Sequence, residues 1–136
     1  MHAVQIADLR KAFEQSREFT LYVGPAQEPR RSVTLRVPTE HQVKLAGLRC
    51  GIAGREDPAA LALLERALLQ GAIVGWSNLL QCDLVPSASA EPMPWAEDLV
   101  PLLLDAQPDW WREPTEGLFE RLAQRNAQRD AAAKNS

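Results

Sequence analysis

Residues that could bind a metal ion or act as nucleophiles are few and widely spaced in this chain. The histidines and cysteines are His2, His41, Cys50 and Cys82, and no two of them have the close spacing that starts a zinc site. His41 and Cys50 lie nine residues apart, which on one helix is about two and a half turns and directs the side chains to opposite faces. A cysteine nucleophile needs its histidine within hydrogen-bond distance. We therefore expect neither a metal site nor a cysteine-dependent catalytic centre.

The carboxylates and glycines also have simpler interpretations than catalysis. Glu56-Asp57 and Glu97-Asp98 are adjacent pairs, which is typical of helix N-termini, where negative charge interacts favourably with the helix dipole. The glycines between residues 47 and 54 match no phosphate-binding loop, because no lysine-serine pair follows them. The sequence predicts no catalytic residue, no cofactor and no enzymatic activity.

Composition argues against several classes of protein. The chain of 136 residues is long enough to bury a hydrophobic core, and its net charge of −3 provides no positive field for nucleic acid or an anionic membrane. Its apolar runs are far shorter than the roughly 20 residues of a membrane-spanning helix, and its first residues do not resemble a signal peptide. We expect one domain over residues 1–125, a frayed tail over 126–136, and a cytosolic location with reduced thiols.

Hydrophobic periodicity predicts a β-hairpin in the N-terminal part of the chain. Apolar and polar residues alternate over 19–23 and again over 32–37, and the connection between them contains glycine and proline, which favours a hairpin. A short amphipathic helix over 5–17 precedes it. Thr39 and Gln42 have the spacing of a capping box, which predicts that a helix begins there.

The remaining segments are predicted to be helices and loops. Asp57 as the N-cap and Pro58 at the first helical position begin a helix that ends before Gly71. A polar loop rich in serine and proline follows over 81–94. Together with the helices described next, these elements predict an α+β fold, which is a mostly helical single domain with a small N-terminal hairpin.

Two helical segments are expected near the C-terminus. The first starts at Trp95, and Pro101 either kinks it or divides it into two short helices. The second extends from Thr115 to about Gln128. Its arginines recur every four residues and line one face, which is either solvated or docks on an acidic partner. Nucleic acid fits poorly because acidic residues share the same region. These arginines are Arg121, Arg125 and Arg129.

Tryptophans are concentrated in the second half of the chain, at Trp76, Trp95, Trp110 and Trp111. Consecutive residues of a helix cannot both face one core, so we expect Trp110 or Trp111 to approach the surface. Tryptophan is enriched where protein interfaces are strongest. The sequence therefore indicates contact with a protein partner as well as core packing.

The order of these features resembles the tail assembly chaperones of long-tailed bacteriophages. The resemblance covers residues 19–125, and Ser77-Asn78 stand where the family usually has a glycine soon after the tryptophan. Four segments carry it: a strand running into a capped helix (33–40), a helix leading to Ile73-Val74-Gly75-Trp76 (58–76), a polar loop with Asp83 and prolines (83–94), and an apolar segment ahead of the last helix (96–104).

The resemblance implies a non-enzymatic role in the host cytoplasm. Such chaperones bind the tape measure protein, keep it soluble and help to recruit tail tube subunits. Exposed apolar helix faces would also favour a homo-oligomer. The residues expected to contact the partner are Trp95, Leu99, Leu103, Trp110, Trp111, Leu118 and Leu122.

Two alternatives from other classes remain open at this point. One is a small phage-encoded inhibitor that binds a host protein, because such inhibitors are also short, acidic and free of catalytic groups. The other is a head-tail adaptor that stays in the virion. The partner recovered from infected cells and the protein content of purified particles distinguish these roles.

Overall fold

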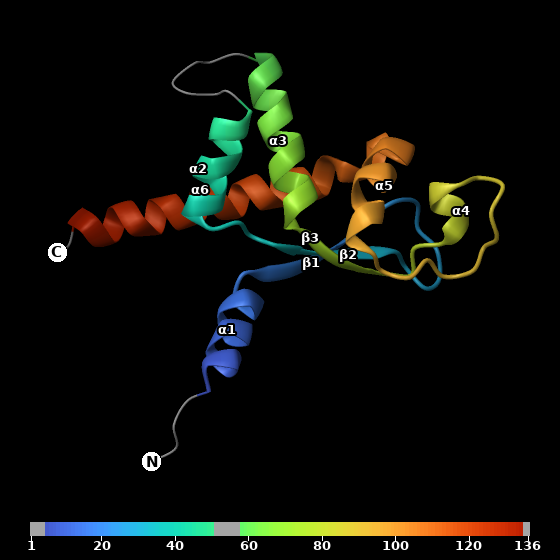
Figure 1. The fold of residues 1–136 in the computed structure, drawn as a ribbon, viewed down its shortest axis with the longest axis horizontal. Helices are drawn as coiled ribbons and strands as arrows, with labels where there is room; N and C mark the ends of the chain where they lie inside the picture. Colours follow the sequence, from blue (N-terminus) through green and yellow to red (C-terminus); the bar gives the residue numbers. More distant parts are fainter. Residues whose placement is uncertain (1–4, 51–57, 135–136) are drawn as a thin grey trace.

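A three-stranded antiparallel sheet is the centre of the molecule. The computed structural model describes residues 5–50 and 58–134. Its strands are β1 (Glu18–Tyr22), β2 (Ser32–Arg36) and β3 (Ile73–Ser77), with β2 in the middle. Figure 1 shows most of the helices on one side of this sheet, which makes the fold the α+β architecture that the sequence predicts.

The predicted hairpin is confirmed as β1 and β2. Thr20 pairs with Thr34 in the ladder, and their hydroxyl oxygens lie 3.3 Å apart. Side chains alternate between the two faces of a strand, so Val33 and Leu35 of β2 both point into the core, where they are fully buried. The opposite face of β2 is polar and only half-buried. The sheet therefore has one face that helices must cover.

The third strand was not predicted. The sequence predicts that a helix ends before Gly71, but α3 (Pro58–Ala72) continues through that residue and runs directly into β3. A run of only five residues containing Gly75 gives a weak strand signal. Pairing with β2, about 40 residues earlier in the sequence, supplies the backbone partners that make it a strand. The predicted N-cap of α3, Asp57, lies outside the described residues.

The helical layer consists of four helices. They are α2 (Glu40–Arg49), α3, α5 (Val100–Ala106) and α6 (Arg112–Lys134), and they lie on the same side of the sheet in Figure 1. Gly117 lets α6 approach β1, because a Cβ atom there would lie 3.2 Å from Leu21 Cδ1. The largest fully buried side chains of the core are Val33, Leu35, Leu79, Val100, Leu103, Pro114 and Leu118.

The predicted capping box begins α2. The backbone N–H of Gln42 donates to Thr39 Oγ1 at 3.2 Å, and the backbone N–H of Thr39 donates to Gln42 Oε1 at 2.9 Å. Two of the donors that a helix N-terminus leaves unpaired are satisfied in this way. α2 nevertheless contains no buried residue. It is held by its N-terminal cap and by a stripe of side chains that are only half-buried.

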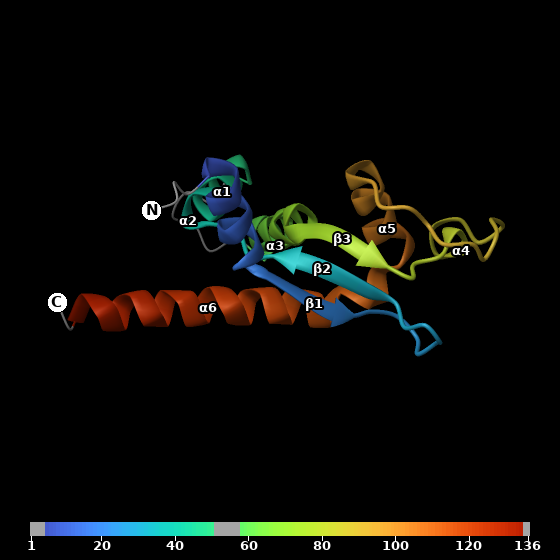
Figure 2. The same ribbon diagram turned by 90° about the horizontal axis from the view of Figure 1, so that it is seen from below.

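The amphipathic helix near the N-terminus is α1 (Ile6–Gln15). It projects from the body on the side of the sheet opposite the other long helices (Figures 1 and 2). None of its residues is buried. The predicted helix is therefore confirmed, but its apolar residues do not join the core.

The segment after Trp95 is divided into two short elements. This is one of the two alternatives, a kink or two short helices, that the sequence left open. A 3-10 turn, η1 (Glu97–Leu99), precedes α5, and Pro101 lies in the first turn of α5. A proline in a first turn removes no intrahelical hydrogen bond, because that N–H has no helical acceptor. The proline therefore starts the helix without disturbing it.

The last helix is longer than predicted at both ends. A second 3-10 turn, η2 (Pro108–Trp111), leads into α6, which begins at Arg112 and continues to Lys134. Residues 126–134, expected to fray, are helical. α6 is the longest described helix, and no helix in the described part of the chain is both long and apolar enough to cross a membrane.

Replacing Gly24 tests how the hairpin loop packs on the second half of the chain. Gly24 has φ of +72°, and a Cβ atom there would lie 2.8 Å from Trp110 Cε2. We expect Gly24→Ala to lower the free energy of unfolding by about 1–3 kcal/mol. Gly47→Ala is the matched control, because no atom lies within 4 Å of that Cβ position, and should raise stability by up to about 1 kcal/mol. Urea unfolding measures both, and similar values for the two variants would contradict this packing.

Candidate partner-binding surface

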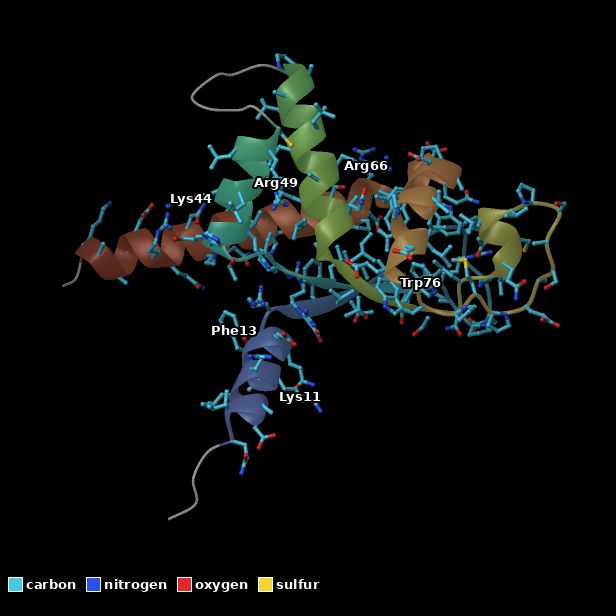
Figure 3. All side chains as sticks on the ribbon, viewed as in Figure 1. Lys11, Phe13, Lys44, Arg49, Arg66 and Trp76 are labelled. Carbon is cyan, nitrogen blue, oxygen red and sulfur yellow. The ribbon has the colours of Figure 1, made fainter. Side chains whose placement is uncertain are left out.

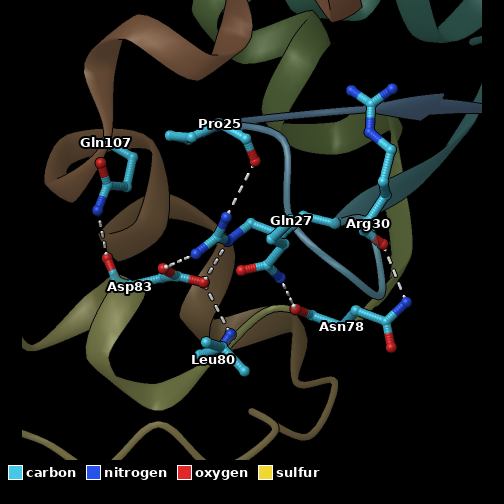
Figure 4. Close-up of polar contacts among 8 residues, drawn as sticks. Pro25, Gln27, Arg30, Asn78, Leu80, Asp83 and Gln107 are labelled. Carbon is cyan, nitrogen blue, oxygen red and sulfur yellow. Dashed lines mark hydrogen bonds and ion pairs between the residues drawn. The ribbon is translucent and has the colours of Figure 1, made fainter.

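The buried carboxylate Asp83 has a structural role. Arg31 donates to both of its oxygens, from Nε to Oδ2 at 2.9 Å and from Nη2 to Oδ1 at 3.0 Å, and the backbone N–H of Leu80 also donates to Oδ2 at 2.8 Å (Figure 4). Gln107 Nε2 donates to the Asp83 carbonyl oxygen at 2.8 Å. Arg31 Nη1 donates to the carbonyl oxygen of Pro25 at 3.2 Å. These bonds tie the hairpin loop, the single turn α4 (Gln81–Leu84) and the end of α5 together.

Asn78 makes the turn that connects β3 to this network. Its φ of +64° lies in the left-handed region that glycine and asparagine tolerate best. Its Nδ2 donates to the carbonyl oxygen of Arg30 at 2.9 Å, and Gln27 Nε2 donates to its carbonyl oxygen at 3.3 Å (Figure 4). Asn78 therefore makes the left-handed turn directly after β3.

Two tryptophans hold the polar loop over 81–94. Trp76 Nε1 donates to the carbonyl oxygen of Met93 at 2.9 Å, and Met93 itself is buried. Trp76 and Trp95 pack edge to face, with ring centroids 4.6 Å apart and an angle of 73° between the rings. Trp95 is 39% exposed, but this internal contact already fixes it.

The residues predicted to contact a partner do not form one surface. Four of these residues are buried in the core of this molecule, so no partner can reach them in this fold. Leu99 and Trp110 are half-buried, which leaves Trp95 as the only exposed residue of the predicted set. The buried four are Leu103, Trp111, Leu118 and Leu122.

The two consecutive tryptophans differ in burial, as expected from the sequence. Trp111 is buried, whereas Trp110 lies nearer the surface. Trp110 packs against the position of Gly24, and the Arg31 guanidinium lies 5.3 Å from its ring centroid. The tryptophan that approaches the surface therefore covers the hairpin loop of its own chain.

The arginine row of α6 also contacts its own chain. The Arg121 guanidinium lies 3.7 Å from the ring centroid of Phe19. Arg125 Nη1 donates to the carbonyl oxygen of Pro38, and Arg129 forms an ion pair with Glu40. The row is therefore neither a fully solvated face nor a free site for an acidic partner, because it fastens α6 to the hairpin and to α2.

Exposed apolar side chains are concentrated on the first three helices. On α1, Ile6, Leu9 and Phe13 are 77%, 57% and 55% exposed, and their spacing of three and four residues places them on one face. Phe13 and Lys11 leave α1 on opposite sides in Figure 3. Large exposed apolar patches on a protein mark interaction sites. The other exposed leucines of these helices are Leu45, Leu48, Leu61 and Leu63.

A groove of about 370 Å³ lies beside the C-terminal end of α1, between α2 and α3. We call it the α1–α2 groove. Its apolar lining comes from the two helices and the start of β3, and its charged lining comes from α1, β2 and α2. The apolar residues are Leu45, Ala46, Ala67, Leu68 and Val74, and the charged residues are Glu14, Arg17, Arg36 and Arg49.

Positive charges crowd one end of this groove. Burial lowers the pKa of Arg17, and the neighbouring charge of Arg36 lowers it further, while Glu14 opposes these effects. Arg17 Nη1 donates to the carbonyl oxygen of Val37 at 2.8 Å. An arginine stays protonated despite such a shift, so Arg17 keeps its positive charge at the end of the groove, close to the carboxylate of Glu14.

Metal ligands do not gather in the described part of the molecule. There, no group of three histidine, cysteine or acidic side chains could hold a metal ion. Cys50 and Cys82 are both free thiols and half-buried. His2 lies outside the described residues.

Comparisons with known proteins assign the chain to no family. No protein-family model, no curated protein and no solved structure matches it. Its function must therefore be inferred from its own residues and surface.

Removing the Asp83 carboxylate tests the polar network. We expect Asp83→Ala to destabilise the fold by about 3–5 kcal/mol, because it leaves the guanidinium of Arg31 buried without its counter-ion. Asp105→Ala is the matched control, since Asp105 pairs with Arg66 at 2.9 Å with a side chain that is 71% exposed. An exposed pair contributes at most about 1 kcal/mol. Equal losses in chemical denaturation would show that the Asp83 network does not hold the fold.

Proposed function

We propose that this protein is a non-enzymatic assembly chaperone that covers an apolar stripe on a helical partner. The exposed apolar face of α1 carries this proposal, because Ile6, Leu9 and Phe13 lie on one helix face that packs against nothing in its own core. An amphipathic helix or a groove of this kind is a common means of binding another helix. In this role the chain acts by covering surface and by no chemical step.

The sequence resemblance supplies the identity of the proposed partner. In phage tail assembly chaperones the partner is the tape measure protein, and tail tube subunits are recruited with it. A long helical protein that has not yet assembled exposes apolar stripes that aggregate unless another apolar surface covers them. We propose that this chain provides that cover in the host cytoplasm.

The proposed contact surface differs from the one inferred from sequence. Most residues between Trp95 and Trp111 that were expected to face a partner pack internally, and so do Leu118 and Leu122 of α6. The first three helices present more apolar surface than that region does. The proposal therefore assigns partner contact to α1, α2 and α3.

Co-expression with the tape measure protein tests the proposal. We expect Leu9→Ser combined with Phe13→Ser to weaken binding by about 2 kcal/mol, roughly thirtyfold, because two partly exposed apolar side chains no longer contribute. The soluble fraction of the tape measure protein should fall accordingly. Since α1 buries no residue, the variant should lose at most about 1 kcal/mol of stability, from the contact between Phe13 and the Arg17 guanidinium at 4.6 Å.

Leu102→Ser is the matched control for this experiment. Leu102 is 53% exposed and belongs to the Trp95–Trp111 region, so it reports on the surface first expected from sequence. A loss of tape measure solubility with Leu102→Ser, but not with the α1 variant, would reject the assignment to α1. Retention of full solubility by both variants would reject the apolar contact itself.

The two other roles predict different results in infected cells. Pull-down of a host protein in place of tail proteins would indicate an inhibitor. Detection of the chain in purified particles would indicate an adaptor, since an assembly chaperone leaves the finished virion. Recovery of the tape measure protein, with absence from particles, is the result that we expect.

A further inference from the structure

The α1–α2 groove combines apolar and basic surface, and its basic side chains are only partly neutralised. Arg36 Nη2 lies 2.8 Å from a carboxylate oxygen of Glu18 and 3.8 Å from one of Glu14. Neither Arg17 nor Arg49 forms an ion pair with a carboxylate in the described part of the chain. Figure 3 shows Arg49 between α2 and α3. Two arginine charges are thus available at the edges of the groove.

The basic edge of the groove reaches the apolar face of α1. Arg17 follows α1 in the turn before β1, and its guanidinium lies 4.6 Å from the ring centroid of Phe13. Phe13 ends the exposed stripe that Ile6 and Leu9 begin. Arg17 also lines the groove, so it connects this stripe with the groove.

Donor atoms at this edge also lack partners. The Nε atoms of Arg17 and Arg36 are buried and make no hydrogen bond with the described residues. Buried donors are normally satisfied, and a guanidinium group is well suited to a carboxylate, which can accept two parallel hydrogen bonds. Because these Nε atoms are themselves buried, a partner would have to meet the outer nitrogens of the guanidinium groups.

This basic surface is a local feature of an acidic chain. Residues 1–75 carry 10 Lys/Arg and 8 Asp/Glu, whereas residues 76–136 carry 5 and 10. The net negative charge of the chain weakens its attraction for anions at long range, so the arginines act on groups close to them. The location of the charge beside an apolar groove instead favours a ligand that is apolar along one stripe and acidic beside it.

We propose that the α1–α2 groove receives an amphipathic helix of the partner whose apolar stripe is bordered by carboxylates, which pair with Arg17 and Arg49. This inference rests on the proposed function and adds the chemistry by which the partner segment is recognised. The apolar lining provides affinity, and the arginines select segments by charge. Helices with the same stripe bordered by lysine are rejected, since like charges at an interface are unfavourable.

Three synthetic helical peptides test charge selection with the full-length protein. All carry the same leucine stripe, and the flanking positions are glutamate, glutamine or lysine. Fluorescence anisotropy should give the order glutamate, glutamine, lysine, with at least a tenfold difference in Kd between the first and the last. The difference should shrink as the salt concentration rises from about 0.05 M to about 0.5 M, because salt screens exposed charges.

A charge reversal at the groove provides the matched variant. Arg49→Glu should weaken the glutamate peptide about fivefold to tenfold and strengthen the lysine peptide, which a structural defect would not do. Arg112→Glu is the control, because Arg112 is equally basic and exposed but begins α6, away from the groove. Its affinities should match those of the unmodified protein.

The outcomes separate this inference from the proposed function. Equal affinity for all three peptides, or no exchange of preference with Arg49→Glu, overturns the charge selection but leaves apolar cover intact. If no peptide binds while the tape measure protein is still kept soluble, the groove is not the site and the chaperone role stands. A dimer in sedimentation analysis that glutamate peptide cannot dissociate would mean that a second copy fills the groove, which also overturns the inference.

Discussion

Coverage of one sheet face is the constraint on which the rest of this molecule depends. Val33 and Leu35 project from the central strand and are fully buried, which is achieved only when helices from the second half of the chain lie over them. Leu103 and Leu118 are buried in the same hydrophobic cluster as these two strand residues. Burying large aliphatic side chains stabilises a fold by about 1.5–3 kcal/mol each. This packing buries the apolar stripes of α5 and α6, so their side chains are not available to a partner.

Because the sheet is covered from one side, the first helices have little left to pack against. α1 and α2 contain no buried residue, although α1 has a well-formed apolar face. The exposed apolar side chains of α1 and α2 contribute little to the core, and they are the surface on which the proposed function rests. The contrast between the exposed faces of α1 and α2 and the packed sheet, α5 and α6 underlies the proposed function.

Polar contacts determine how the two halves meet. The arginine row of α6 reaches Phe19, Pro38 and Glu40, and the Arg31–Asp83 pair joins the hairpin loop to the segment after β3. These contacts link residues about 50 to 100 positions apart, and a buried pair of this kind favours one arrangement because breaking it is costly. They keep α6 against the sheet and leave the α1–α2 groove open beside it.

The sequence by itself determined the elements whose signals are local. Alternation marked the hairpin, and the Thr39–Gln42 box marked the start of α2. Pro101 marked a kink or a division of the segment after Trp95, and the structure shows the division. Each of these signals depends on neighbours within a few residues. Only the tertiary structure decided which apolar stripes are buried, that residues 73–77 form a strand, and that the α6 arginines bind their own chain. A stripe such as Leu118 and Leu122 has the same pattern whether it faces a core or a partner. The choice between the two depends on which distant segments pack against it, and short-range sequence patterns do not encode that choice.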